Sequence, residues 1–500
     1  MAKSSFTRRE FLKISALSST AFALGSCASL DRSFMGDKRD LTNEVVIIGA
    51  GAAGLAAAYA LKKRKIPFRV FEASSRVGGR VQTVSMFPDG GPVAELGAEF
   101  IDDSHKAVFA IAKELNLPLR EIKGPSGLEA HIFSFNARTY RVKDLASKMK
   151  TLAGPIRRVR QDLYRQQDVT LNYKNSLQFE RSAYYDSMSL KDLLDSWASE
   201  VDPVILKLIE AQAVARFGVD AENQSSLHFL ETLDAEGSSL LQGSRTYRME
   251  GGLTQLISTL HERVAGVIPQ YIVKTNNVLT EIFEKKGVFE LTFKSPNGHG
   301  TYTSKNVICT IPFSKLREVE GLQKLEFSSL KKDAILAQDY ATHSKGALAF
   351  NDPFWRKKSG KIPGNLGNFT GDFLTQKFWD SGRGQDGTQG LLTFQRGGKS
   401  GAEAGALAPQ AAVQDFNLFY DMNSHSVLDS NFVNWSLKPW SLGSMAYFKK
   451  GQYMRFKGVA GEAEYRGHFQ FAGEHTSMLA AGTLQGALET GLIAAANVNI

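Results

Sequence analysis

The hydrophobic pattern near the beginning of the chain predicts a strand, a tight turn, a helix and a second strand over residues 43–72. Residues 45–48 are all apolar and β-branched, which is typical of a parallel strand buried on both faces. Residues 55–61 are rich in Ala and Leu and favour a helix packed on that strand. Residues 68–71 form the next predicted strand. Such a unit is the smallest that holds a dinucleotide.

Glycines separate the first strand from the helix. Gly49 permits the tight turn, Gly51 lets the backbone approach a pyrophosphate, and Gly54 allows close packing of helix on strand. The N-terminus of the helix, around Ala53, presents free N–H groups to phosphates. Glu72 follows the second strand about twenty residues further on, where an acidic side chain accepts a hydrogen bond from a ribose hydroxyl. The unit is therefore predicted to bind a dinucleotide with an unphosphorylated ribose; an ordinary glycine-rich turn is the alternative.

The rest of the chain mixes strand and helix patterns. Residues 278–282 and 288–293 alternate apolar and polar positions around 285–287, which predicts a hairpin of the kind found in a β-meander. Residues 307–309 are apolar, and the segment 306–312 is predicted to be another buried strand, ending in proline. Residues 105–239 carry apolar positions at helical spacing and are expected to be largely helical.

Composition and charge are those of a globular chain. With 500 residues, 43% of them hydrophobic, the chain suits two interleaved domains with sizeable cores. The net charge of +9 is mild, and the arginines of 157–165 are expected on a solvated helix face, with an anionic partner as the less favoured alternative. The sequence shows no nucleic-acid motif and no metal-ligand cluster. The two cysteines, Cys27 and Cys309, leave no internal disulfide in a processed chain.

The first residues concern export rather than the fold. Residues 5–13 resemble a twin-arginine signal, and the apolar stretch 14–24 is too short to span a bilayer as a helix. Residues 24–27 resemble a bacterial lipobox, which implies lipidation of Cys27; a plain signal peptide with an incidental cysteine is the alternative. We expect a signal peptide over 1–27, a polar tether over 28–42, a periplasmic location and a membrane tether through Cys27.

A second glycine pair follows Glu72 in the sequence EASSRVGGRVQT of residues 72–83. This stretch resembles the flavin-containing amine oxidase family, which includes monoamine, polyamine and L-amino-acid oxidases, and in which it lies along FAD. The resemblance implies that Ala73, Gly79 and Arg80 contact the cofactor. Arg76 either does the same or faces solvent.

Residues 94–101 are similar to the family segment that passes the flavin ring. By this resemblance Gly97 and Ala98 allow the backbone to approach the ring, and Glu99 or Phe100 faces the substrate. The resemblance also covers residues 247–253, a return to the cofactor, and the C-terminal motifs 471–477 and 482–492. It assigns further cofactor contacts to Val273, Gly473, Glu474, Gly482, Thr483 and Leu484.

Residues 343–355 resemble the family stretch in which a strand lysine precedes a Pro-Phe-Trp corner. The matching residue, Lys345, is the expected catalytic group, because the family lysine holds a water against flavin N5. A surface lysine on an edge strand is the alternative.

Two positions depart from the monoamine oxidase pattern. Ser444 stands where a flavin-bearing cysteine would be, so FAD is expected to be non-covalent. Met445 and Thr483 stand where two aromatic rings would flank the substrate amine, which predicts a larger or differently polarised pocket. Trp440, Tyr447 or Phe100 could supply a replacement ring.

The expected fold is α/β: a Rossmann-like, glutathione-reductase-like FAD-binding domain with a β-meander, interleaved with an α+β substrate domain. The FAD-binding domain is expected over 43–104, 240–320 and 445–500, and the substrate domain over 105–239 and 321–444.

The resemblance implies oxidation of the C–N bond of a monoamine, polyamine or L-amino acid to an imine, with hydride transfer to flavin N5 and reoxidation by O2 to give H2O2. An L-amino acid would need a buried arginine for its carboxylate. Two alternatives stay open: a desaturase or isomerase acting on an apolar substrate, and a membrane-tethered flavoprotein that passes electrons to a quinone or partner protein.

Overall fold

The computed structural model describes residues 38–163, 170–233, 240–241, 245–266 and 272–498. The expected export signal and Cys27 lie outside these residues and stay predictions. Within the described ranges, no helix is both long enough and apolar enough to cross a membrane.

A five-stranded parallel sheet carries the predicted dinucleotide unit, with strand order β11-β3-β2-β15-β23. The strands are β2 (Val45–Ile48), β3 (Phe68–Phe71), β11 (Val273–Lys274), β15 (Asn306–Cys309) and β23 (Phe469–Phe471). All four residues of β2 are buried, as their apolar character predicts.

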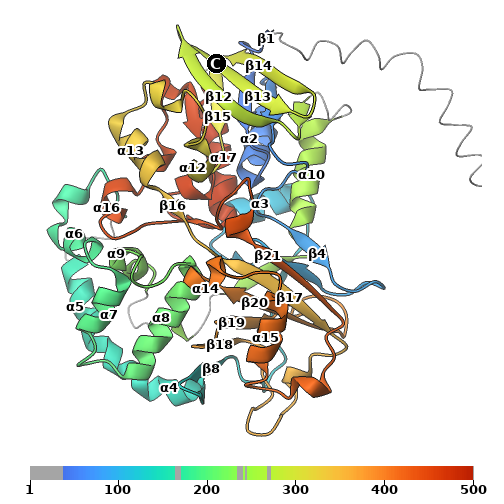
Figure 1. Cartoon of the computed structure of the whole chain (residues 1–500), viewed down its shortest axis with the longest axis vertical. Helices are drawn as coiled ribbons and strands as arrows, with labels where there is room; N and C mark the ends of the chain where they lie inside the picture. Colours follow the sequence, from blue (N-terminus) through green and yellow to red (C-terminus); the bar gives the residue numbers. More distant parts are fainter. Residues whose placement is uncertain (1–37, 164–169, 234–239, 242–244, 267–271, 499–500) are drawn as a thin grey trace, which may run out of the picture.

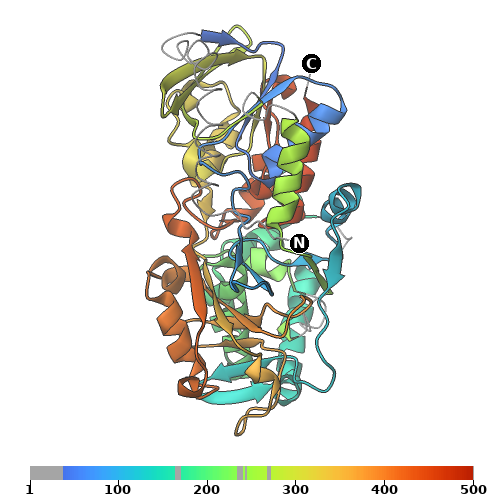
Figure 2. The same cartoon turned by 90° about the vertical axis from the view of Figure 1, so that its right-hand side faces the viewer.

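The two faces of this sheet are covered differently. Helices α2 (Ala52–Lys63), α3 (Lys106–Glu114), α10 (Thr254–Ala265) and α17 (Leu484–Asn497) pack on one face. A meander of β12 (Val278–Lys285), β13 (Val288–Ser295) and β14 (Gly298–Ser304) packs on the other, with β1 (Lys38–Asp40) beside β14. Figure 2 shows these layers from the side. The predicted Rossmann-like unit, hairpin and meander are thus confirmed.

A seven-stranded sheet forms the other half of the molecule, drawn below in Figure 1. In spatial order its strands are β21 (Asp429–Asn434), β17 (Ser344–Phe350), β20 (Gly390–Arg396), β19 (Lys377–Asp380), β18 (Phe369–Gly371), β8 (Ile132–Phe135) and β9 (Arg138–Arg141). Helix α15 (Ala408–Phe416) covers one face through Leu348, Phe394 and their neighbours. The opposite face turns towards the cavity described below.

A group of helices lies beside this sheet (Figure 1). It comprises α4 (Val142–Met149), α5 (Ala153–Leu163), α6 (Glu180–Asp186), α7 (Leu190–Ser196), α8 (Pro203–Phe217) and α9 (Ser226–Leu230). Residues 105–239 are nevertheless not helical throughout, because β8 and β9 complete the seven-stranded sheet. Helix α3, just beyond the expected domain boundary at residue 104, shares the core of α2 and α17.

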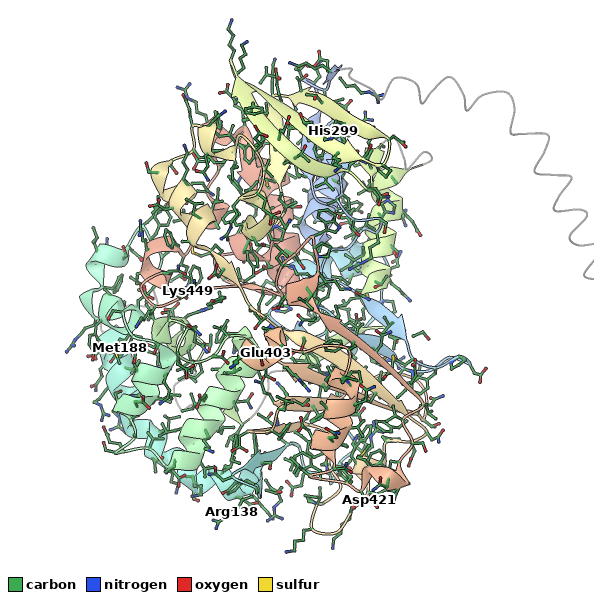
Figure 3. The ribbon with its side chains drawn as sticks, viewed as in Figure 1. Arg138, Met188, His299, Glu403, Asp421 and Lys449 are labelled. Atoms are coloured by element: carbon green, nitrogen blue, oxygen red, sulfur yellow. The ribbon has the colours of Figure 1, made fainter. Side chains whose placement is uncertain are left out.

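Smaller elements connect the two sheets. Three short sheets are formed by β4 (Thr83–Ser85) with β5 (Val93–Glu95), by β6 (Ile101–Asp102) and β7 (Leu119–Glu121) with β10 (Thr246–Met249), and by β16 (Asp339–Tyr340) with β22 (Ala446–Tyr447). The remaining α-helices of the described residues are α12 (Phe313–Leu316), α13 (Ser329–Ala337), α14 (Gly398–Ala402) and α16 (Tyr453–Phe456). His299 on β14 and Asp421 beyond α15 lie towards opposite ends of the molecule (Figure 3).

Candidate active site

A cavity of about 980 Å³ is lined by residues from both sheets and from the C-terminal motif. The predicted catalytic residue Lys345 lines it, and so do the predicted cofactor residues except Gly54 and Val273. Of the predicted substrate residues, Met445 and Thr483 line it, whereas Glu99 and Phe100 do not. The structure therefore brings together most of a site whose residues are hundreds of positions apart in the sequence.

The dinucleotide turn forms one end of the cavity. The Glu72 carboxylate accepts hydrogen bonds from the backbone N–H groups of Ala50 (2.7 Å) and Ser74 (2.8 Å). Burial raises its pKa, and these two N–H donors offset part of the shift. Helix α2 begins after Gly51 with no side-chain cap and no acidic residue in its first turn. Its first N–H groups are therefore available to an anion at the cavity wall.

Gly54 and Gly51 of this turn have different roles, one in packing and the other at the cavity. A Cβ on Gly54 would lie 2.0 Å from the Gly49 carbonyl oxygen, so Gly54 serves close packing and does not line the cavity. A Cβ on Gly51 would meet nothing in the protein closer than the Gly79 Cα at 4.0 Å. The space in front of Gly51 thus fits a pyrophosphate, and together with Glu72 it fits a dinucleotide.

The expected cofactor contact of Val273 is not supported. Val273 lies in β11, paired with Val70 of β3, and is not among the cavity-lining residues. Val278, the first residue of β12, lines the cavity instead. Val273 and Val278 begin the successive strands β11 and β12, and only the path of the chain between these strands decides which valine borders the cavity.

Arg80 and Glu474 join the two ends of the chain at the cavity wall. The Arg80 Nη1 donates to Glu474 Oε1 at 2.8 Å and to the Ser444 carbonyl oxygen at 2.6 Å. Glu474 Oε2 also accepts from the Gly482 N–H at 3.0 Å. Thr483 then caps α17, because its Oγ1 accepts from the Gly486 N–H. The predicted cofactor residues of the C-terminal motif are held in place by this network.

Arg76 also lines the cavity, and its guanidinium is engaged with the neighbouring loop. It donates to the carbonyl oxygens of Val77 and Val81, each at 3.1 Å, and to that of Gly79 at 2.5 Å. Arg76 thus fixes the conformation of the glycine pair that follows Glu72.

Lys345 is buried on β17, with a side chain 7% exposed, so the alternative of a surface lysine is wrong. Its Nζ donates to Glu99 Oε2 at 2.5 Å and to the Gly97 carbonyl oxygen at 3.1 Å. An ammonium group has three donors. Because Lys345 lines the cavity, its third N–H is available to a water or ligand there.

Glu99 was expected at the substrate, but it is an internal counter-ion. Its carboxylate pairs with Lys345 and Arg248, and it accepts from Trp379 Nε1 and Ser381 Oγ, each at 2.9 Å. Burial alone would raise its pKa, but the charges of Lys345 and Arg248 lower it to about 2. The carboxylate is therefore ionised and fully engaged.

Phe100, the other residue expected at the substrate, is 40% exposed. Its ring lies 5.9 Å from that of Trp379, and the Arg248 guanidinium lies 5.3 Å from its centroid. It packs against the outside of the Glu99 cluster and does not border the cavity.

Several cavity residues were not predicted from the sequence, among them Ala215, Arg216, His343, Gln395 and Trp435. Burial lowers the pKa of His343 to about 4, so the ring is neutral. Its Nε2 lies 3.1 Å from the Ala215 carbonyl oxygen, and its Nδ1 lies 2.8 Å from Ser444 Oγ. Donation from Nε2 to the carbonyl leaves Nδ1 to accept from the Ser444 hydroxyl.

Arg216 is held at the cavity by the end of α8. The helix ends at Phe217 because Gly218 adopts a left-handed conformation with φ of 65°. The partial negative charge at a helix C-terminus stabilises the guanidinium. Burial lowers the pKa of Arg216, and the charge of Asp102 offsets part of that shift. Within the described ranges the guanidinium contacts the Phe217 ring at 5.6 Å and forms no ion pair.

A helix-ending glycine after Arg216 could have been recognised in the sequence as a stop signal. Nothing in the sequence, however, indicates that this helix end borders the cavity, since the contact depends on packing between distant segments.

Known proteins resemble this chain over most of its length. A sequence profile described as flavin containing amine oxidoreductase matches residues 52–499. The flavin-dependent L-tryptophan oxidase RebO of Lentzea aerocolonigenes is 28% identical over 90% of this chain and 97% of its own length. The L-amino acid oxidase of Cerastes cerastes is 24% identical over 91% of this chain and 86% of its own length.

Solved structures share the fold. A putrescine oxidase superposes with a TM-score of 0.76 at 18% identity, covering 91% of this chain and 99% of that one. Cyclohexylamine oxidase from Brevibacterium oxydans IH-35A superposes with a TM-score of 0.75 at 17% identity, covering 91% and 98%. The chain therefore belongs to the flavin-containing amine oxidoreductases, enzymes whose cofactor FAD is the dinucleotide that this cavity fits.

Proposed function

We propose that this amine oxidoreductase acts on an L-α-amino acid, whose carboxylate Arg216 binds. The observation that carries the proposal is the Arg216 guanidinium, which lines the cavity and has no carboxylate paired with it among the described residues. An arginine fork matches a carboxylate in geometry and charge. The similarity to two L-amino-acid-oxidising relatives, at low identity, supports the same substrate class.

The charges of the cavity favour an anionic substrate over a diamine. The carboxylates that line it are Glu72, Glu318, Glu320 and Glu474. Glu72 and Glu474 accept hydrogen bonds from the protein, and Glu318 pairs with Lys315. Glu320 lies beside Thr280 near Val278, at the nucleotide end, with its N–H donating to the Thr280 carbonyl. A second amine would find no unengaged carboxylate beside Arg216 and Lys345.

The proposed reaction removes two electrons and two protons from the amino acid to give an imino acid, which water hydrolyses to a keto acid and ammonia. When bound, FAD supplies the hydride acceptor for this oxidation. Arg216 orients the substrate by its carboxylate, and Lys345 donates an N–H to a water or to the substrate nitrogen. With O2 taking up the two electrons and two protons, the second product is H2O2.

Slow reoxidation of the reduced enzyme by O2, with fast reoxidation by a quinone, would overturn this choice of electron acceptor.

Arg216→Met is expected to lower kcat/KM for L-amino acids by about 10²-fold to 10³-fold, because the charge pair between the guanidinium and the substrate carboxylate is lost. Arg216→Lys should restore part of the activity. The activity towards decarboxylated amines should change by less than about threefold. Oxygen consumption and peroxide formation by the FAD-loaded enzyme measure these changes.

Arg138→Met serves as the control, since Arg138 is exposed on β9 and does not line the cavity; Figure 3 shows it at the lower edge of the molecule. The proposal is wrong if Arg216→Met lowers the oxidation of amines and amino acids equally.

A further inference from the structure

Three polar side chains lie in one row across the seven-stranded sheet. Lys345 of β17 is directly opposite Gln395 of β20, and Gln395 is directly opposite Lys377 of β19. Directly opposite residues of antiparallel strands point to the same face, with Cβ atoms about 5 Å apart. Lys345 and Gln395 line the cavity. Lys377 is not among the lining residues and lies one strand beyond Gln395 in the same polar row.

Lys377 is a partly buried cation without a counter-ion of its own. Within the described ranges it forms no ion pair, and its ammonium lies 5.9 Å from the centroid of the Trp379 ring. Burial lowers its pKa, and the neighbouring charges of Arg216 and Lys345 act in the same direction. Glu99 acts in the opposite direction, but its carboxylate is already paired with Lys345 and Arg248.

The other groups near Lys377 cannot neutralise it. Thr370 of β18 is directly opposite Lys377, and its hydroxyl lies 2.9 Å from His131 Nε2. Burial lowers the pKa of His131 to about 3, so this ring is neutral. Gln395 directs its Nε2 to the Ala215 carbonyl oxygen. An uncompensated charge in such surroundings is costly, and an anionic ligand would offset that cost.

We propose that the substrate is an acidic L-amino acid, whose α-carboxylate binds Arg216 and whose side-chain carboxylate binds Lys377. The inference rests on the proposed function and specifies its substrate class. Two cations, Arg216 at the end of α8 and Lys377 on β19, match two carboxylates, and Lys345, which pairs with Glu99, lies at the other end of the row. A neutral side chain would leave Lys377 without a counter-ion.

The test compares L-glutamate and L-aspartate with L-glutamine and L-asparagine, which have nearly the same shape without the second charge. The FAD-loaded enzyme should have a kcat/KM at least tenfold higher for one acid than for its amide. Lys377→Met should lower kcat/KM for that acid by about 10²-fold, because the charge pair is lost. In Lys377→Met, kcat/KM for the amide should change by less than about threefold. The control Lys399→Met, at an exposed lysine of α14, should change kcat/KM for neither the acid nor the amide.

Binding without turnover gives a second measurement. Glutarate and succinate should perturb the visible spectrum of the FAD-loaded enzyme at lower concentrations than butyrate, and Lys377→Gln should abolish the difference. If the wild type oxidises amides as well as acids, or if Lys377→Met affects both equally, the inference is wrong while L-amino-acid oxidation stands. If no L-amino acid is oxidised but simple amines are, the proposed function itself has failed.

Discussion

The Glu99 carboxylate shows how a single residue can set the charge balance of the site and the position of its lysine. It neutralises Lys345 and Arg248 together, and it accepts from Trp379 and Ser381. Its role is to position the Lys345 ammonium at the cavity rather than to contact the substrate. Removing one partner of a buried charge cluster leaves the others uncompensated.

Glu99→Gln is therefore expected to destabilise the enzyme by about 3–5 kcal/mol. Glu222→Gln, at an exposed position, should change stability by less than about 0.5 kcal/mol. Because the folded pKa of Glu99 is lowered from 4.5 to about 2, its stabilising contribution is complete above pH 4.5 and is lost as the pH falls towards 2. Urea unfolding measured at several pH values should show a weaker acid dependence in Glu99→Gln. An unchanged acid dependence would contradict this assignment.

The role of a residue in the site could be predicted only where a sequence motif identified it. Lys345 could be assigned because the Pro-Phe-Trp corner after it matches a family pattern, and the structure buries it at the cavity. Glu99 was misassigned because the orientation of its side chain depends on Arg248, 149 positions away. Arg216 and Lys377 carry no local signal of a binding role, since only the packing of α8 brings Arg216 to the cavity and only the pairing of β19 with β20 places Lys377 beside Gln395.

At the scale of elements, the turn before α2 determines cofactor binding. Gly51 has φ of −73° and ψ of −176°, a conformation that any residue adopts, and a Cβ there would meet no protein atom closer than 4.0 Å. That Cβ would point into the space that fits the pyrophosphate.

Gly51→Ala is expected to weaken FAD binding at least tenfold while the thermal unfolding of the cofactor-free chain stays unchanged. Titration with FAD and thermal unfolding with and without FAD measure the two effects. Gly54→Ala is the contrasting variant, because its Cβ would lie 2.0 Å from the Gly49 carbonyl oxygen and should destabilise the chain itself. Unchanged FAD binding in Gly51→Ala would show that the pyrophosphate lies elsewhere.

Elements with strong local patterns were predicted correctly. The strand β2, the helix α2 and the hairpin of β12 and β13 follow directly from apolar runs and alternation. The strands β8 and β9 were missed, because each has only four residues: the apolar β8 is held in the sheet by pairing with β18, and the polar β9 by pairing with β8.

For the whole molecule, the site exists only where the two sheets face one another. The five-stranded sheet and the C-terminal motif supply the dinucleotide end, and the seven-stranded sheet supplies Lys345 and Gln395. The fold class was predictable because the dinucleotide unit is local in sequence. The substrate end was not, since it combines α8, β17 and β20 through contacts between distant segments.

Anaerobic reduction of the bound flavin tests the central claim most directly, because it reports oxidation of the substrate without depending on the electron acceptor. The FAD-loaded enzyme would be mixed, without oxygen, with L-amino acids, their D-enantiomers and their decarboxylated amines, and the visible absorbance of oxidised flavin recorded. We expect bleaching by L-amino acids, fastest with an acidic one, and little by the other two groups. Bleaching by amines but not by L-amino acids, or by neither, would contradict the account.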